Sequence, residues 1–155
     1  IPDAMALEVV GDIIACDANS PCSYEPHHPD LYWYGVHGVE ILYAAMGKGC
    51  VSVTRVSTPN EDVVVGRWED GRIGTFRGMR HAKRGYGCTV FGDKADATGS
   101  GHEYQSLIKE VVKFFQTGEP PIPPEETVEM FAFMQAADDS KEAGGKPVSM
   151  PKIEF

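Results

Sequence analysis

The sequence lacks both long apolar runs and an excess of positive charge. No stretch approaches the roughly 18 unbroken apolar residues that a membrane-spanning helix needs, so we expect a soluble chain without a membrane partner, and we favour the cytoplasm as its compartment. The formal net charge is −9, and nucleic acid would repel such a chain as a whole. We therefore expect small molecules or proteins as partners and no nucleic acid.

Sequence fingerprints of several nucleotide and hydrolase sites are also missing. The paired glycines at 47–49, 85–87 and 99–101 have neither the third glycine nor the strand-turn-helix context of a dinucleotide-binding fingerprint. The sequence contains no P-loop and no G-x-S-x-G nucleophile elbow. We therefore expect no Rossmann domain and no cofactor-binding residue in this chain.

Cysteine is scarce. The cysteines are Cys16, Cys22, Cys50 and Cys88, which are too few for a disulfide scaffold in a chain of 155 residues and include no C-x-x-C pair. We interpret them as small hydrophobic residues. A disulfide between Cys16 and Cys22, which flank a loop, is the alternative in an oxidising compartment.

The residues that are present predict a single α+β domain over 1–155, because the length and the 42% hydrophobic content suit one core. Asp70-Gly71 marks a tight turn between two strand-like runs. The expected elements are a strand over 6–15, a loop over 16–30, a helix over 33–47, strands over 50–57, 62–70, 71–79 and 86–92, a flexible segment over 93–101, and helices from 104 to Gly118 and from 124 to Gly144-Gly145. This order predicts an open, mainly antiparallel β-sheet covered by helices, with a meander of about four strands and a fifth from the N-terminal run.

Gly35 and Gly38 lie inside the helix expected over 33–47. Glycine in a helix interior costs about 0.5–1 kcal/mol relative to alanine. We therefore expect a close-packed neighbour or a ligand where these two residues leave the helix backbone bare.

Titratable side chains concentrate between residues 27 and 40. His27, His28, His37, Asp30 and Glu40 fall within fourteen residues, and the three-residue spacing of His37 and Glu40 puts them on one helical face. Three interpretations are open: solvated or packed histidines, a metal site without a known ligand spacing, and a proton-handling or substrate-binding role for His37. Imidazole suits the last role because it changes charge near neutral pH.

Basic side chains concentrate between residues 67 and 84. This segment holds six basic residues and only two acidic ones. The basic residues are Arg67, Arg72, Arg77, Arg80, Lys83 and Arg84, and the acidic residues are Glu69 and Asp70. Guanidinium groups in such a segment suit an anionic ligand, a subunit contact or the solvent face of an antiparallel sheet.

Four stretches of the chain carry a family signature. They are YGVHGVEILYAAMG at 34–47, VVVGRWEDGRIGTFRG at 63–78, GYGCTVFG at 85–92 and the closing LIKEVVKFF to GGKPV at 107–148. Together they resemble the C-terminal domain of the glucose-fructose oxidoreductase / inositol dehydrogenase / MocA family, over nearly the whole chain. The most specific part of the resemblance is G-x-H-x-x-E at Gly35, His37 and Glu40.

The resemblance implies a two-domain NAD(P)-dependent oxidoreductase that acts on a sugar, polyol or related compound. Its N-terminal Rossmann domain, which would hold NAD or NADP, is missing from this chain, and its antiparallel sheet lines the substrate pocket and forms a homo-oligomer contact. His37 matches the histidine that the family uses in catalysis or substrate binding, whereas Trp33 stands where the family usually has Asp.

From these patterns we expect His37 as the catalytic residue and no metal ligands. The expected substrate-binding residues are His27, His28, Asp30, Trp33, His37, Glu40 and Arg80. We interpret the chain, which has no initiator methionine, as a fragment or stand-alone substrate-binding and oligomerisation domain that is not active alone. Two alternatives are a non-enzymatic module that assembles through its sheet, and a metal-dependent hydrolase or lyase that uses the cluster at 27–40.

Overall fold

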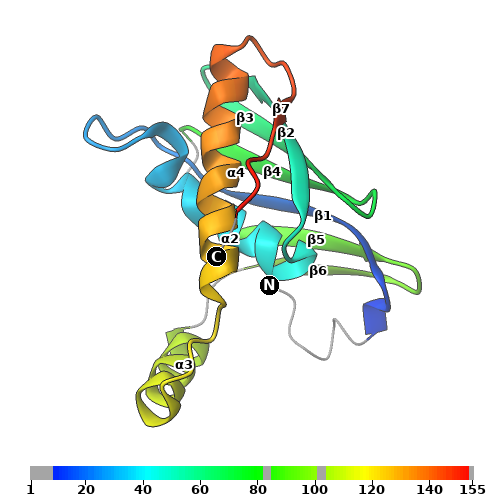
Figure 1. Cartoon of the computed structure of the whole chain (residues 1–155), viewed down its shortest axis with the longest axis vertical. Coiled ribbons are helices and arrows are strands. Elements are labelled where there is room, and N and C mark those ends of the chain that lie inside the picture. Colours follow the sequence, from blue (N-terminus) through cyan, green and yellow to red (C-terminus); the bar gives the residue numbers. More distant parts are fainter. Residues whose placement is uncertain (1–8, 82–84, 101–103, 154–155) are drawn as a thin grey trace.

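An open sheet of seven strands forms the body of the protein (Figure 1). The computed structural model describes residues 9–81, 85–100 and 104–153. The strands are β1 (Ile13–Pro21), β2 (Cys50–Ser57), β3 (Glu61–Trp68), β4 (Ile73–Met79), β5 (Gly87–Gly92), β6 (Asp96–Ser100) and β7 (Val148–Ser149). They lie in the order β6-β5-β1-β4-β3-β2-β7, and each neighbouring pair is antiparallel except β1 with β4, which is parallel. This arrangement confirms the expected α+β fold with an open, mainly antiparallel sheet.

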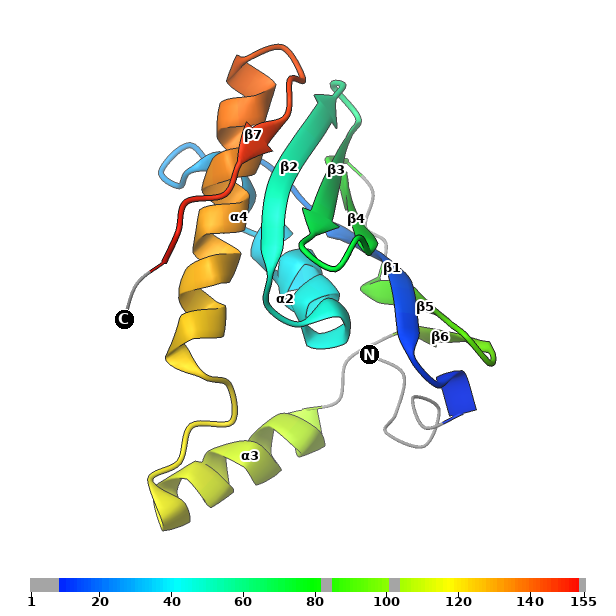
Figure 2. The same cartoon turned by 45° about the vertical axis from the view of Figure 1, so that its right-hand side comes forward.

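Two helices cover one face of this sheet. The helical elements are the short 3-10 helix η1 (Asp30–Tyr32) and the helices α2 (Gly35–Met46), α3 (Tyr104–Thr117) and α4 (Pro124–Glu142). α2 packs against β1, β4 and β5, α4 packs against β2, and the two helices contact each other. Figure 2 shows both on the same side of the sheet. The core lies between these layers, and its largest fully buried aromatic side chains are Trp68, Tyr43, Phe76 and Phe133.

α2 lies close to the sheet because two of its residues have no side chain. A Cβ atom at Gly38 would lie 2.2 Å from the Phe76 ring and 2.8 Å from the Ser20 hydroxyl. A Cβ atom at Gly35 would lie 3.0 Å from the sulfur of Cys22. The close-packed neighbour that the sequence predicts at both glycines is therefore confirmed.

Gly38→Ala is expected to lower the free energy of unfolding by about 1–3 kcal/mol, because the added methyl overlaps a core ring. The direction opposes helix propensity, which favours alanine over glycine by about 0.8–1 kcal/mol. Urea unfolding followed by circular dichroism measures the change. Combining Gly38→Ala with Phe76→Leu makes room for the methyl, so the double variant should lose less stability than the two single losses added together. A Gly38→Ala protein as stable as the wild type would contradict this packing.

Local sequence signals locate several element ends. The turn at Asp70-Gly71 joins β3 to β4 as expected, and Gly71 has a φ of 92°. Gly47 (φ 67°) ends α2, and Gly118 (φ 73°) follows α3. Pro124 occupies the first turn of α4, where its missing N–H costs nothing.

The cysteines are all buried and free, so their interpretation as small hydrophobic residues is confirmed. Cys16 and Cys22 do not form a disulfide. Burial raises the pKa of the Cys22 thiol to about 11 and that of Cys50 to about 12. Both thiols therefore stay protonated and weakly nucleophilic near neutral pH.

The structure corrects the expectation for the first thirty residues. The strand predicted over 6–15 and the loop predicted over 16–30 are both misplaced, because β1 spans Ile13–Pro21; residues 6–8 lie outside the described part of the chain. Pairing with β4 on one side and β5 on the other holds this polar run in the sheet. Pro21 is tolerated because it ends the strand.

Strand order also departs from the local pattern. The segment 93–101, expected to be flexible, contains β6, which pairs with the edge of β5. The expected meander holds only for β2, β3 and β4, because β1 lies between β4 and β5. β1 pairs with strands that are distant in sequence, and local hydrophobic periodicity gives no signal for such a pairing.

α3 stands apart from the sheet and the other helices (Figures 1 and 2). The sequence predicts this helix correctly, but its apolar side chains face solvent. They are between 40% and 81% exposed, and they are Leu107, Ile108, Val111, Val112, Phe114 and Phe115. None of the helices in the described residues has the length and hydrophobicity needed to cross a bilayer.

Candidate functional site

His37 and Glu40 form a hydrogen-bonded pair on the exposed face of α2. Both side chains are 50% exposed, and His37 Nδ1 lies 2.9 Å from Glu40 Oε2. Val39 and Tyr43 are buried on the opposite face, as the spacing predicts. A carboxylate oxygen accepts hydrogen bonds, so in the neutral imidazole the tautomer that donates from Nδ1 to Glu40 leaves Nε2 as an acceptor. The pair can therefore take a proton from a hydroxyl group placed at Nε2.

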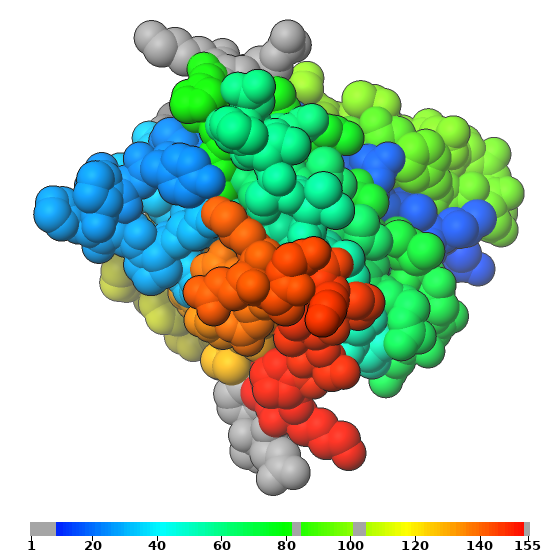
Figure 3. Space-filling model, turned by 90° about the horizontal axis from the view of Figure 1, so that it is seen from above, coloured from blue at the N-terminus to red at the C-terminus, as the bar shows by residue number. Residues whose placement is uncertain are grey.

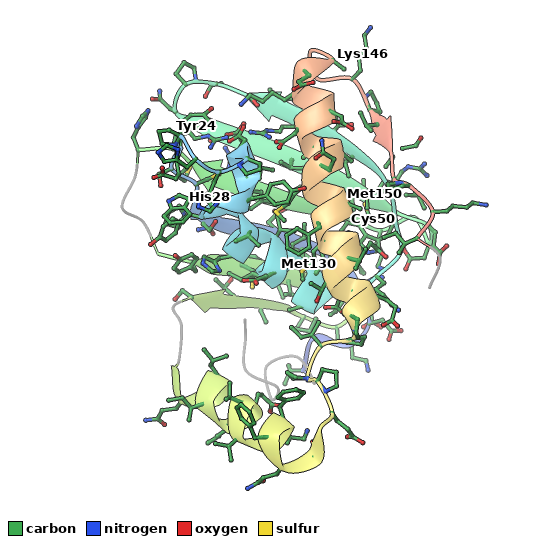
Figure 4. All side chains as sticks on the ribbon, turned by 60° about the vertical axis from the view of Figure 1, so that its left-hand side comes forward. Tyr24, His28, Cys50, Met130, Lys146 and Met150 are labelled. Carbon is green, nitrogen blue, oxygen red and sulfur yellow. The ribbon has the colours of Figure 1, made fainter. Side chains whose placement is uncertain are left out.

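Five rings follow one another along the surface beside this pair. We call His28, Trp33, Tyr34, His37 and Tyr86 the ring row. The centroids of consecutive rings lie 4.7, 5.5, 5.9 and 5.7 Å apart in that order. Trp33 and Tyr34 are 37% and 40% exposed, and Figure 4 shows His28 near Tyr24 at the same edge of the molecule. The ring row thus places partly exposed aromatic surface next to the His37–Glu40 pair.

An open groove adjoins the ring row at Tyr86. Its volume is about 370 Å³, and the residues that line it include Asn19, Thr89, Thr98 and Ser100. This volume lies within the range of small-ligand sites. Amide and hydroxyl groups are the donors and acceptors that the hydroxyls of a sugar require. The groove, the ring row and the His37–Glu40 pair form one candidate site.

Behind the ring row, a charged cluster fastens the segment 22–34 to the sheet and to α4. We call it the ion network, and its members are Asp30, Arg55, Asp62, Arg80, Asp138 and Lys141. Three positive charges balance three negative ones. Figure 3 shows the blue segment that precedes α2 lying beside the C-terminal half of α4, in orange.

Asp30 is the centre of the ion network. Its carboxylate lies 2.6 Å from Arg55 Nη2, 2.7 Å from Arg80 Nη2 and 2.7 Å from Lys141 Nζ. Burial raises the pKa of Asp30, but the hydrogen bond from Lys141 and the charges of the two arginines outweigh it, so this pKa lies below its ordinary value. Asp30 therefore stays ionised, and it holds η1 in place at the base of the ring row.

Asp62 and Asp138 complete the ion network in different environments. Asp62 is fully buried and accepts from Arg55 Nε at 2.9 Å, and it also pairs with Arg80. Asp138 is partly exposed and pairs with Arg55. Burial raises the pKa of Asp138 above its ordinary value, and Arg55 offsets this only in part.

The structure divides the predicted site residues between the two clusters. Trp33, His37, Glu40 and His28 lie at the surface around the ring row, and His27 is exposed in the preceding loop. Asp30 and Arg80 belong to the ion network instead. Arg80 is 4% exposed, and its guanidinium lies 3.9 Å from the centre of the Tyr24 ring.

The cluster at 27–40 does not converge as a ligand set. Asp30 is held by cations, the ring of His28 contacts that of Trp33 at a tilt, and His37 bonds to Glu40. Across residues 9–81, 85–100 and 104–153, no group of three or more His, Cys, Asp or Glu side chains is arranged to hold a metal ion. Within the part of the chain that the structure describes, the cluster at 27–40 therefore supplies no ligand set for the metal-dependent alternative.

The basic residues of the segment 67–84 do not form one positively charged surface. Arg72 pairs with Asp70 and Arg77 with Glu61, so much of its charge is neutralised locally. Lys83 and Arg84 lie outside the described residues. Arg67 is exposed on the sheet face that the helices leave uncovered.

Sequence reasoning missed the partners of Asp30 and Arg80, although a signal existed. Alternation along β2 puts Arg55 on the same face as buried Val53, and alternation along β3 puts Asp62 on the same face as buried Val64. A charged residue at an inward strand position needs a partner of opposite charge. Two such residues of opposite sign on neighbouring strands predict an ion pair.

Comparison with known proteins identifies this fold. The sequence matches no protein-family model and no curated protein. The structure is similar to scyllo-inositol dehydrogenase from Lactobacillus casei with NAD(H) and scyllo-inositol (TM-score 0.74, 13% identity, 94% of this chain and 58% of that chain). It is also similar to myo-inositol dehydrogenase from Lactobacillus casei with NAD(H) and myo-inositol (TM-score 0.71, 10% identity, 97% of this chain and 57% of that chain). A third similar structure is the WlbA dehydrogenase from Bordetella pertussis with NADH and UDP-GlcNAcA (TM-score 0.68, 17% identity, 98% of this chain and 59% of that chain).

These similarities lie in the fold, since all three identities are low. The chain spans less than three fifths of the length of each of these dehydrogenases. The part that it matches is their C-terminal domain, as the sequence resemblance predicts.

Proposed function

Because the chain has the fold of the C-terminal domain of glucose-fructose oxidoreductase / inositol dehydrogenase / MocA-type dehydrogenases, we propose that it is the substrate-binding domain of an NAD(P)-dependent oxidoreductase. The proposed substrate is a sugar, a polyol or a related compound. The observation that carries the proposal is the His37–Glu40 pair beside a groove lined with amide and hydroxyl groups. Three dehydrogenases of the same fold carry such substrates or NAD(H) in their structures.

In this proposal His37 handles the proton of the substrate. Oxidation of an alcohol removes a hydride from carbon and a proton from oxygen. Nε2 of His37 accepts the hydroxyl proton, while the hydrogen bond from Nδ1 to Glu40 stabilises the imidazolium that forms. Oxidised NAD or NADP would supply the hydride acceptor.

The cofactor does not fit this chain by itself. A dinucleotide fold needs parallel strands linked by helices and a glycine-rich turn, whereas β1 with β4 is the one parallel pair among the described strands. We therefore assign the cofactor to an N-terminal Rossmann domain outside this chain. The solvent-facing apolar side of α3 is where we propose that this domain docks, because burying it removes the most exposed apolar cluster of the described residues from water.

The sheet face without helices is the proposed contact of a homo-oligomer. Val56 and Ile73 are 63% and 50% exposed there, and Arg77 with Glu61 adds a charged pair. The same face supports the second candidate, a non-enzymatic module that assembles through its sheet. Substrate binding separates the two candidates, because the module has no use for the His37 site.

The proposal is tested by titrating the chain with inositols and methyl glycosides, followed by saturation-transfer NMR. His37→Ala is expected to weaken binding at least about tenfold, which corresponds to about 1.4 kcal/mol. His81→Ala is the matched control, since this exposed histidine bonds only to the Pro59 carbonyl in the described structure, at 3.1 Å, away from the candidate site. An unchanged affinity in His37→Ala would contradict the assigned role.

Calorimetry with NADH tests the division of labour between domains. We expect no micromolar binding by this chain alone, because the dinucleotide site lies elsewhere. Micromolar NADH binding would overturn the proposal. Self-association without binding of any sugar would favour the assembly module instead.

A further inference from the structure

The ring row is larger than a free polyol needs. Rings that share contacts normally bury their faces, yet Trp33 and Tyr34 keep 37% and 40% of their surface in solvent. A six-membered sugar is about the size of one aromatic ring. A ligand that is only a sugar would therefore engage one member of the row and leave its neighbours exposed.

The row is also held in a fixed arrangement before any ligand arrives. η1 carries Asp30, whose three cationic partners come from β2, from the residue after β4 and from α4. Leu31 of the same turn is fully buried. A surface fastened in this way loses little conformational entropy when it binds.

The chemistry of the row differs along its length. At the Tyr86 end it meets the groove with Asn19, Thr89 and Thr98, which suits hydroxyl groups. At the other end, the rings of His28 and Trp33 lie in tilted contact, with an interplanar angle of 33° and centroids 4.7 Å apart. Trp33 also stands where the sequence resemblance would place an aspartate, so an indole face replaces a hydroxyl acceptor there.

We infer that the site takes a glycoside whose sugar is joined to a planar aromatic group. The sugar occupies the groove and the His37–Glu40 pair, and the aromatic group stacks on Trp33 and its neighbours in the ring row. This inference rests on the proposed function and names its substrate class. Trp33 is the residue that sets the specificity, because its indole is the largest ring of the row and is 37% exposed.

Tryptophan fluorescence reports on this site directly. The chain has two tryptophans, and Trp68 is fully buried with its Nε1 bonded to the Gly47 carbonyl at 2.9 Å. Only the emission of Trp33 should respond to a ligand at the surface. Phenyl and methyl glycosides of glucose and galactose are the probes, and the phenyl compounds are expected to bind about tenfold more tightly.

Two variants separate stacking from a general structural effect. Trp33→Ala is expected to remove most of the tenfold preference for phenyl over methyl glycosides, measured by calorimetry, while Trp33→Phe retains it. His81→Ala is the control, because this exposed ring bonds to the Pro59 carbonyl and lies outside the row. It should leave both affinities unchanged.

The outcomes distinguish this inference from the proposed function. Equal binding of phenyl and methyl glycosides, with neither affinity changed in Trp33→Ala, would overturn the inference and leave the oxidoreductase proposal standing. Binding of none of the probes, with the inositols included, would overturn both. A phenyl preference that Trp33→Ala removes and Trp33→Phe keeps would support the inference.

Discussion

Replacing Asp62 with Asn should lower the free energy of unfolding by about 3–5 kcal/mol, the cost of removing one partner from a buried charge network. Asp62 is fully buried and pairs with both Arg55 and Arg80. Without its charge, two buried guanidinium groups share the carboxylates that remain. Urea denaturation followed by circular dichroism measures the loss.

Asp138→Asn is the matched control within the same network. Asp138 is partly exposed, and burial already disfavours its charged form, as its raised pKa indicates. Neutralising it should cost about 1 kcal/mol or less. If Asp138→Asn proved as destabilising as Asp62→Asn, the network would not depend on burial in the way described.

The effect of Asp62→Asn should also reach the candidate site. Arg55 and Arg80 hold Asp30, and Asp30 holds η1 beneath the ring row. A shift in the Trp33 emission of the folded Asp62→Asn protein, below its unfolding transition, would report this coupling. An unchanged emission spectrum would show that the ring row is positioned independently of the network.

Phe133→Ala should cost about 3–5 kcal/mol of stability, whereas Phe115→Ala should change it by about 0.5 kcal/mol or less. Phe133 is fully buried on α4, packs edge to face on Tyr43 with centroids 5.7 Å apart, and lies against Gly66. Phe115 is 81% exposed on α3. Chemical denaturation of both variants, compared with the wild type, measures the difference.

Phe115→Ala has a second readout when the proposed Rossmann domain is supplied in trans. Because α3 is the proposed docking surface, this variant should weaken the association of the two domains while Phe131→Ala, on α4 and 47% exposed, should not. A destabilised isolated chain in Phe115→Ala would mean that α3 packs on the sheet in solution. That result would contradict its separation in Figures 1 and 2.

The sequence predicts local structure well where the conformation depends on adjacent residues in the chain. The helix over 35–46, the turn at Asp70-Gly71 and the first turn of α4 at Pro124 all follow from backbone preferences of a few adjacent residues. It also predicts that Gly38 meets a close neighbour, but it does not identify Phe76 as that neighbour. The pairing of His37 with Glu40 follows from helical spacing alone.

Placement of β1 and β6 depended on partners far away in the sequence. Residues 16–21 favour a loop by composition, yet pairing with β4 and β5 satisfies their backbone groups and holds them in the sheet. β6 is a strand because its backbone groups pair with the otherwise unpaired edge of β5. The predicted substrate-binding roles of Asp30 and Arg80 stay predictions, and the structure adds the buried partners that surround them.

By itself, the sequence determined the helices, the hairpin turn, the exposed His37–Glu40 face and the resemblance to a dehydrogenase domain, because each depends on residues close together in the chain. Only the tertiary structure decided the strand order, the ion network behind Asp30 and the row of rings that runs from His28 to Tyr86. These features join segments that are distant in sequence. Their energies come from burial and charge pairing, which exist only once the chain has folded.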